Sequence, residues 1–183
     1  MNLTVEKTPL GGLLLIKPRI FRDARGFFTE TYNQETFAAA GVPTDFKQDN
    51  HSKSSRGTLR GLHFQTTPGQ AKLVRCAVGS IWDVAVDIRP DSPTFGQHHG
   101  VVLTPDEAAM FYIPVGFAHG FMVLSDTAEV LYKSSNVYHP ATEAGIAWND
   151  PDLNVQWPLE GFEVLLSDRD KGNQSFKDYR ATL

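Results

Sequence analysis

Residues 71–88 read AKLVRCAVGSIWDVAVDI, and this stretch decides the fold class. Two apolar runs, 71–78 and 81–88, flank a Gly79-Ser80 turn, which is the pattern of a β-hairpin. In the second run Trp82, Val84 and Val86 alternate with smaller or acidic residues, as expected of a strand with two different faces. The stretch therefore predicts a pair of neighbouring strands in a mostly β protein.

The rest of the chain has the same character. Short apolar or aromatic segments recur at 13–16, 27–32, 100–103 and 127–135, and the fifteen Gly and eleven Pro separate them. One convincing helix is predicted over 34–40, with Asn33 as N-cap and Gly41 and Pro43 ending it. The charged run 168–171 is expected, by default, to be solvated. Many short strands predict a sandwich or barrel, and without a linker or repeat the 183 residues form one domain, 1–183.

Composition limits the function classes. The net charge of −4 argues against nonspecific nucleic-acid binding, so an anionic ligand needs a local cluster of Arg and Lys. The single Cys76, expected in the core, excludes an internal disulfide and favours a reducing compartment. There is neither a signal-peptide pattern at the N-terminus nor an apolar run long enough to span a bilayer. We expect a cytoplasmic protein without nucleic-acid or membrane partners.

Candidate chemistry centres on Arg60-Gly61-Leu62-His63-Phe64-Gln65 and on Lys72. Residues two apart on a strand share a face, so His63 and Gln65 point one way and Leu62 and Phe64 the other. An imidazole with Arg60 and Lys72 nearby suits proton transfer on an anionic substrate. The alternative is a hydrogen-bonded core histidine without a catalytic role.

A metal site is the first chemistry to test. The string Pro114-x-Gly116-x-x-His119 resembles the second motif of cupins, which are small jelly-roll β-barrels. Metal-binding cupins usually supply His-x-His and a Glu from their first motif, but here the match is His63-Phe64-Gln65, with no Glu following. Two imidazoles and an amide are a poor ligand set for iron or zinc. The sequence predicts no metal, although the barrel can still hold one small ligand.

Proton chemistry without a metal is the remaining hypothesis. His63 is a candidate base, and Lys72 or Arg60 could stabilise an oxyanion. Tyr132 lies in an apolar strand, where a phenol is either hydrogen-bonded or used. Its alternative is an ordinary core or edge tyrosine. Either Asp83 or Asp170 could orient an imidazole, and the set suits proton removal next to a carbonyl.

Several longer blocks resemble one family. They are 60–65, Gln70-Ala71-Lys72-Leu73-Val74-Arg75, Asp83-Val84-Ala85-Val86-Asp87-Ile88-Arg89, Ser92-Pro93-Thr94-Phe95-Gly96, 113–121, Tyr132-Lys133, Trp148-Asn149-Asp150-Pro151 and Leu166-Ser167-x-x-Asp170. The family is the dTDP-4-dehydrorhamnose 3,5-epimerases, cofactor-free cupin enzymes of dTDP-L-rhamnose synthesis. The match runs in one register from about Phe21 to Phe176.

The resemblance implies an all-β cupin jelly roll and a substrate, dTDP-4-dehydro-6-deoxy-D-glucose, that is epimerised at carbons 3 and 5. It implies that His63 is the base, Asp170 its partner, Tyr132 the acid and Lys72 the residue near the keto oxygen. Neither metal nor cofactor is implied.

The resemblance also implies substrate contacts and a homodimer. The implied contacts to the diphosphate, sugar or nucleotide are Arg60, His119, Arg169, Gln48, Asn50 and Glu143, with Tyr138 stacking on thymine. Arg169 departs from the Lys that is usual in the family; the charge is kept but the geometry differs. Arg25 and Glu30 match contacts that come from an N-terminal segment exchanged with the partner subunit, which makes Phe27-Phe28 the expected interface.

Three alternatives stay open on the sequence. A related enzyme could invert carbon 5 alone or carbon 3 alone. A non-catalytic cupin could bind nucleotide-sugars or serve as an oligomerisation domain. A metal-dependent cupin oxygenase is the third, and Gln65 counts against it.

Overall fold

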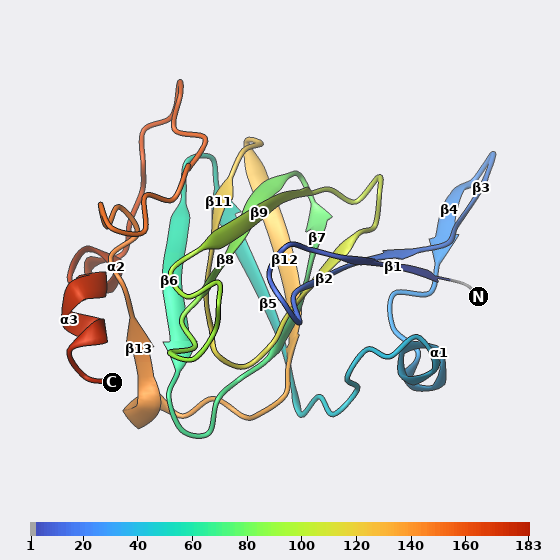
Figure 1. The fold of residues 1–183 in the computed structure, drawn as a ribbon. Coiled ribbons are helices and arrows are strands. Elements are labelled where there is room, and N and C mark those ends of the chain that lie inside the picture. Colours follow the sequence, from blue (N-terminus) through green and yellow to red (C-terminus); the bar gives the residue numbers. More distant parts are fainter. Residues whose placement is uncertain (1–2) are drawn as a thin grey trace.

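The computed structural model describes residues 3–183, whose main body is a pair of facing β-sheets (Figure 1). The six-stranded sheet has the order β1-β2-β10-β7-β12-β5, and the five-stranded sheet has the order β13-β6-β11-β8-β9. The strands of the first sheet are β1 (Leu3–Lys7), β2 (Leu14–Pro18), β10 (Met110–Ile113), β7 (Lys72–Val78), β12 (Thr127–Ser134) and β5 (Gln48–Ser55). Those of the second are β13 (Glu143–Gly145), β6 (Leu59–Gln65), β11 (Phe117–Val123), β8 (Ile81–Asp87) and β9 (His98–Leu103).

The remaining elements are small. They are the hairpin of β3 (Ile20–Asp23) and β4 (Gly26–Thr29), the helices α1 (Gln34–Ala39), α2 (Asp168–Lys171) and α3 (Phe176–Arg180), and the 3₁₀ turn η1 (Pro140–Thr142). The all-β prediction is confirmed. In the part of the chain that is described, no helix is long and apolar enough to cross a bilayer.

The predicted hairpin of residues 71–88 is wrong in its pairing. Both segments are strands, but β7 lies between β10 and β12 and β8 lies between β11 and β9, in the other sheet. Gly79, at φ +76°, has no space for a side chain, since a Cβ would lie 2.0 Å from Thr127 O. The Ser80 amide donates to Ser125 Oγ over 2.8 Å. The turn is therefore held against the β11–β12 connection and takes the chain from one sheet to the other.

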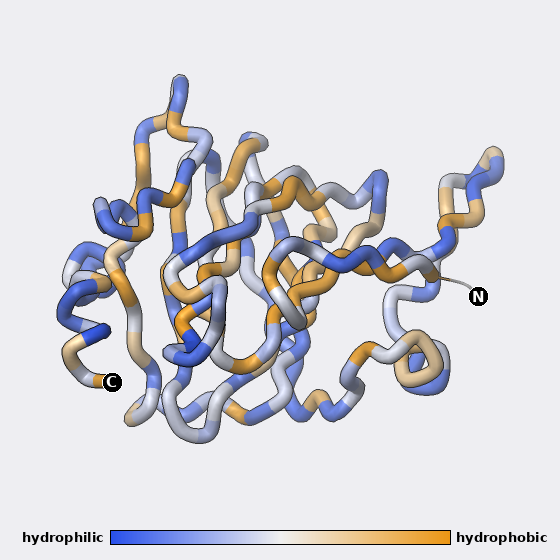
Figure 2. The backbone as a smooth tube through the Cα atoms, in the orientation of Figure 1, coloured by the Kyte–Doolittle hydropathy of each residue, from blue (hydrophilic) through white to orange (hydrophobic). Residues whose placement is uncertain are grey.

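Strand β8 has no exposed face, although its residue types alternate along the sequence. Between the sheets, Phe111, Phe117 and Cys76 belong to one buried cluster, which confirms Cys76 as a core residue. The other face of the five-stranded sheet is covered by the C-terminal segment, with Trp157 and Tyr179 among its buried residues. Both faces of β8 are thus enclosed. Figure 2 shows hydrophobic stretches along the strands of both sheets.

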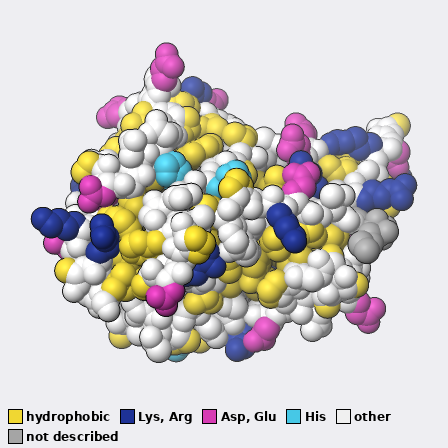
Figure 3. All heavy atoms as spheres, in the orientation of Figure 1, with side chains coloured by type: hydrophobic (Ala, Val, Ile, Leu, Met, Phe, Trp, Pro, Cys, Tyr) yellow, Lys and Arg dark blue, Asp and Glu magenta, His cyan; other side chains and the backbone are white. Residues whose placement is uncertain are grey.

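The N-terminal region differs from the prediction in one strand. Helix α1 forms as expected, with Asn33 Oδ1 accepting from the Thr36 amide at 3.0 Å. The strand predicted over 27–32 instead ends at Thr29. The β3–β4 hairpin projects from the body of the protein (Figure 1), and its rings Phe21, Phe27 and Phe28 are 45%, 52% and 69% exposed. Figure 3 shows basic and hydrophobic side chains together on this projection.

A bulge between β6 and β11 sets the positions of two histidines. The pairing joins His119 to His63 and Phe121 to Arg60, so one residue of β11 opposes two of β6. Gly61 has φ +132°, and a Cβ there would lie 2.6 Å from the Gly120 Cα. Only glycine allows the strands to approach so closely, and bulges of this kind re-aim the side chains beside them. His63 and His119 consequently lie directly opposite each other.

Candidate active site

His63 on β6 and Asp170 on α2 form a hydrogen-bonded pair, which we call the dyad. His63 Nε2 lies 2.5 Å from Asp170 Oδ1, although 107 residues separate them in sequence. Asp170 is 4% exposed and is the one buried residue of α2, where the Ser167 hydroxyl accepts its amide hydrogen at 3.1 Å. The default expectation of a solvated run over 168–171 is therefore wrong at this position. The helix begins at the Ser167 cap, which turns the carboxylate toward β6.

The dyad makes His63 suitable as a base. Burial acts to raise the pKa of Asp170, but the hydrogen bond and charge of His63, together with Ser167 and Arg169, hold that pKa below its ordinary value. An ionised Asp170 requires a hydrogen on Nε2 of His63, which leaves Nδ1 with the lone pair. The carboxylate then stabilises the imidazolium that forms when Nδ1 takes a proton.

His63 faces a cavity of about 230 Å³ between the sheets. The cavity is lined by Gln48, Asn50, His63, Phe64, Gln65, Gln70, Lys72, Tyr132, Tyr138 and Glu143. Most of the site residues expected from the sequence thus share one space. Gln70 was not expected among them, and its amide donates to Asn136 O at 2.8 Å. The alternation predicted for β6 is confirmed for Leu62, which lies in the opposite, apolar cluster; Phe64 belongs to that cluster but also borders the cavity.

Tyr132 brings a phenol to this cavity from the six-stranded sheet. It is paired across β12 with Asn50 of β5 and Val74 of β7, so the three side chains share the inner face. Burial raises the pKa of Tyr132, with Arg60 lowering it and Glu143 raising it further. The phenol therefore keeps its proton at neutral pH and is available as an acid.

Lys72 and His119 form a second polar pair. Lys72 Nζ lies 3.5 Å from His119 Nδ1, and His119 Nε2 lies 3.0 Å from both carboxylate oxygens of Asp83. Burial lowers the pKa of Lys72 to about 8, against the charges of Asp83 and Glu143. The sequence offered Asp83 and Asp170 equally as partners of an imidazole. In the structure, Asp170 is the partner of His63, and Asp83 is the partner of His119.

Two guanidinium groups lie beside His63. A second cavity of about 380 Å³ is lined by His63, Asp170, Arg60 and Arg169, among others. Arg60 donates to Ser54 Oγ from Nε at 3.2 Å and from Nη2 at 3.0 Å. The arrangement places fixed positive charge next to the dyad, which suits an anionic ligand.

Glu143 joins several expected ligand contacts into one cluster. Arg169 Nη1 donates to Glu143 Oε2 at 2.6 Å, and the Tyr138 hydroxyl donates to the same oxygen. Gln48 accepts the Tyr138 amide hydrogen at 2.7 Å and donates to Asn50 Oδ1 at 2.8 Å. The cluster ties the β13 side of the cavity to β5.

Arg25 and Glu30 are not brought to this cavity within one chain. Arg25 is exposed on the β3–β4 hairpin and pairs with Asp23 at 2.6 Å, while Glu30 accepts from Asn33 Nδ2 at 3.3 Å. The contacts implied for these two residues are therefore not formed within a single chain.

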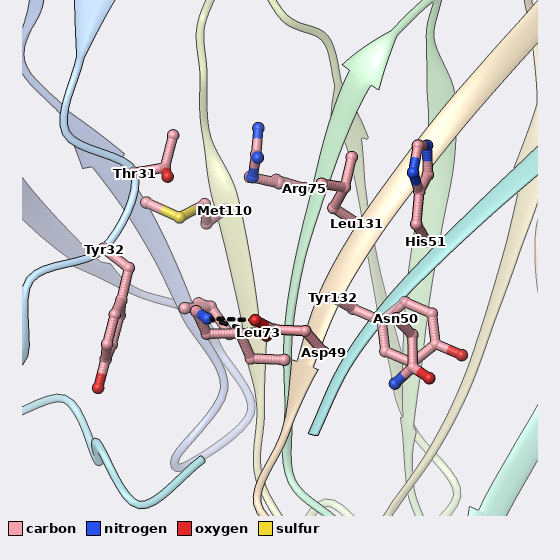
Figure 4. Close-up of a pocket in the computed structure, with 11 residues that line it drawn as sticks. Thr31, Tyr32, Asp49, Asn50, His51, Leu73, Arg75, Met110, Leu131 and Tyr132 are labelled. Carbon is pink, nitrogen blue, oxygen red and sulfur yellow. Dashed lines mark hydrogen bonds and ion pairs between the residues drawn. The ribbon is translucent and has the colours of Figure 1, made fainter. Parts of the chain in front are cut away.

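A larger pocket of about 410 Å³ lies on the outer face of the six-stranded sheet. In Figure 4, Tyr32 and Thr31 line one side of it, and Lys133 Nζ donates to Asp49 at 2.8 Å. Figure 4 also shows Asn50 and Tyr132 pointing away from Tyr32. Neither the His63–Asp170 pair nor the His119–Asp83 pair lines this pocket, so we place the candidate site in the cavity between the sheets.

The donor set at the cavity does not resemble a metal centre. The Lys72 ammonium lies beside His119 Nδ1, so a metal ion bound to this nitrogen would be repelled by a neighbouring cation. In the described range, 3–183, no three His, Cys, Asp or Glu side chains are grouped so as to hold a metal ion.

Comparisons with known proteins identify the family of the chain. The family model described as dTDP-4-dehydrorhamnose 3,5-epimerase matches residues 7–178. A dTDP-4-dehydrorhamnose 3,5-epimerase of Shigella flexneri is 51% identical over 178 residues, covering 96% of this chain and 97% of that protein. The crystal structure of a dTDP-6-deoxy-D-glucose-3,5-epimerase of Legionella pneumophila, in complex with dTDP-4-keto-L-rhamnose, has a TM-score of 0.91 at 44% identity, covering 94% and 92% of the two chains.

A relative with a narrower activity is also similar. The crystal structure of a 3'-monoepimerase of Streptomyces bikiniensis, in complex with dTDP-quinovose, has a TM-score of 0.91 at 35% identity, covering 97% of this chain and 90% of that one. The family model and the relative at 51% identity each cover nearly the whole chain. The chain therefore belongs to the dTDP-4-dehydrorhamnose 3,5-epimerase family.

Proposed function

We propose that the protein is an isomerase that converts dTDP-4-dehydro-6-deoxy-D-glucose to dTDP-4-dehydro-L-rhamnose, without a metal or other cofactor. One observation carries the proposal: His63, which is hydrogen-bonded to Asp170, and the Tyr132 phenol line the same cavity from facing sheets. A base and an acid on opposite walls can remove a proton from one face of a carbon and return one to the other. Family membership supports the sugar nucleotide as substrate.

Proton transfer would proceed through an enolate. Carbons 3 and 5 both flank the 4-keto group, so a single base can serve each in turn after the sugar ring reorients. His63 takes the proton, and the Lys72 ammonium stabilises the negative charge that develops on the keto oxygen. Tyr132 then protonates the carbon from the opposite face, which inverts it. The raised pKa of Tyr132 and the ionised Asp170 support these assignments.

The binding roles belong to the same proposal. Arg60 and Arg169 beside the dyad are suited to the diphosphate. We do not assign the diphosphate to His119, because its two ring nitrogens already face Asp83 and Lys72. Tyr138 is 47% exposed at the cavity and can stack on thymine. Gln48, Asn50 and Glu143 supply hydrogen-bonding groups around it. A cytoplasmic location, favoured by the single cysteine, is part of the proposal too.

We expect the wild-type protein to exchange hydrogen at both carbons. The test is incubation with dTDP-4-dehydro-6-deoxy-D-glucose and a chelator in deuterated water, followed by NMR of each carbon position. Exchange at one carbon alone would show a mono-epimerase, like the Streptomyces relative. No exchange would contradict the enzyme proposal, and exchange that returns only with added metal would favour metal-dependent chemistry.

A homodimer that completes the site is the last part of the proposal. The projecting hairpin exposes Phe27 and Phe28 beside Arg25, and an exposed apolar strand of this kind favours an interface. We expect Phe28→Asp to give a monomer in analytical ultracentrifugation, with substrate exchange reduced. Val102→Asp is the matched control, since Val102 is similarly exposed on edge strand β9. A Phe28→Asp protein that remains dimeric would show that the hairpin is not the interface.

A further inference from the structure

Asp83 is buried and charged, yet it has no role in the chemistry described above. It lies on β8 with no exposed surface, and both of its oxygens face His119 Nε2 at 3.0 Å. His119, on β11, is itself buried, and its second nitrogen, Nδ1, faces Lys72 Nζ on β7 at 3.5 Å. Three side chains from three strands and both sheets thus form one line that ends at the cavity.

The protonation states along this line follow from the geometry. The Asp83 carboxylate can only accept, so Nε2 of His119 carries the hydrogen and Nδ1 carries the lone pair. Burial lowers the pKa of His119, as does the neighbouring charge of Lys72, while Asp83 acts in the opposite direction. A neutral His119 can accept from the Lys72 ammonium, whereas an imidazolium would repel it.

We propose that Asp83 is a positioning residue that acts through His119 to keep Lys72 protonated and aimed into the cavity. The inference rests on the proposed function, in which the Lys72 ammonium stabilises the enolate oxygen. An ammonium with too little negative charge around it would lose its proton in this buried position. Asp83 supplies that charge without occupying the cavity, because His119 stands between the carboxylate and the substrate space.

Other groups facing Lys72 do not replace Asp83. Glu143 on β13 also raises its pKa, but that carboxylate already accepts from Arg169 and Tyr138. His63 on β6 and the protonated Tyr132 phenol on β12 line the same cavity and supply no negative charge. The Arg60 guanidinium, which lines the second cavity with His63, adds positive charge. The buried Asp83 is therefore the carboxylate on which the Lys72 charge most depends.

The pH profile of Asp83→Asn tests the proposal. Lys72 has a pKa of about 8, so in the wild type the enolate-stabilising charge is lost as the pH rises through this value. The amide can still accept from Nε2, but its negative charge is gone, so the pKa of Lys72 falls further. We expect the alkaline limb of kcat/KM to move down by about one pH unit, which at pH 8 is a loss of roughly fivefold. Near pH 6 the rate is expected to return toward that of the wild type.

Asp87→Asn is the matched control. Asp87 is equally buried on β8, but it pairs with Arg89 at 2.6 Å and not with His119. This variant is expected to keep the wild-type alkaline limb, even if it is less stable. If the limb of Asp83→Asn stays at the wild-type pH, or moves equally in Asp87→Asn, the proposal is wrong.

A measurement on the unmodified protein needs no substrate. ¹⁵N NMR of histidine-labelled protein reports which ring nitrogen of His119 carries hydrogen. The expected result at pH 7 is a neutral ring with hydrogen on Nε2 alone, and a cationic ring or one with hydrogen on Nδ1 would overturn the proposal. Because this result does not depend on turnover, it separates failure of the Asp83 assignment from failure of the proposed epimerase function.

Discussion

His63→Asn is expected to abolish hydrogen exchange at both carbon 3 and carbon 5 of the substrate, with epimerisation slowed by roughly 10²- to 10⁴-fold. The reason is that one imidazole serves as the base for both positions, and the dyad with Asp170 offers no second group to replace it. Asn has no basic nitrogen, although its amide can still hydrogen-bond to Asp170. The measurement is deuterium incorporation followed by NMR under the conditions used for the wild type.

The control for this variant is His51→Asn. His51 lies on the exposed, outer side of β5, where it pairs with Glu129 at 3.0 Å. Its replacement is expected to leave exchange at both carbons unchanged. Thermal unfolding of both variants shows whether the fold is intact. If a folded His63→Asn protein still exchanged either carbon at the wild-type rate, another base would have to be sought for that position.

Tyr132→Phe is expected to separate exchange from inversion. The base remains, so His63 still removes the proton and can return a deuteron to the same face of the carbon. Without the phenol no acid acts from the opposite wall, and inversion at carbon 5 is lost by roughly 10²-fold or more. NMR of the recovered sugar should show deuterium at carbon 5 with the original configuration.

Tyr112→Phe removes a buried phenol hydroxyl from β10 of the same sheet and is the control for Tyr132→Phe. Normal inversion is expected there. Should Tyr132→Phe lose exchange as completely as His63→Asn does, the base would have to be Tyr132 or require it, and the two roles proposed here would be reversed or merged.

The fold class could be predicted from the sequence, but the pairing of the strands could not. Short β-rich segments between Gly and Pro residues indicate strands, but they do not show which strands are neighbours. Gly79-Ser80 has the local pattern of a hairpin turn, and only its contact with the β11–β12 connection sends β7 and β8 into different sheets. That contact joins residues far apart in sequence, so no local pattern records it.

The site shows the same division between local and long-range information. His63 and Gln65 could be placed on one face because strand alternation is a local property. Asp170 could not be linked to His63 by spacing, and only the family resemblance joined them. The burial of Asp170 within a charged run follows from its contact with β6, which neither charge nor periodicity reveals. The partners of Asp83 needed the register of β8 against β11.

The shortness of α2 has a consequence for the dynamics of the enzyme. A helix of four residues has no stability of its own, so it stays in place through the Ser167 cap and the contacts of Asp170 with His63 and of Arg169 with Glu143. Segments held by so few contacts open at a much lower free energy than the barrel that carries them. Local unfolding of α2 would leave both sheets intact and His63 without its carboxylate. The fraction of molecules with a competent base is then set by the docking equilibrium of this one turn, independently of global stability.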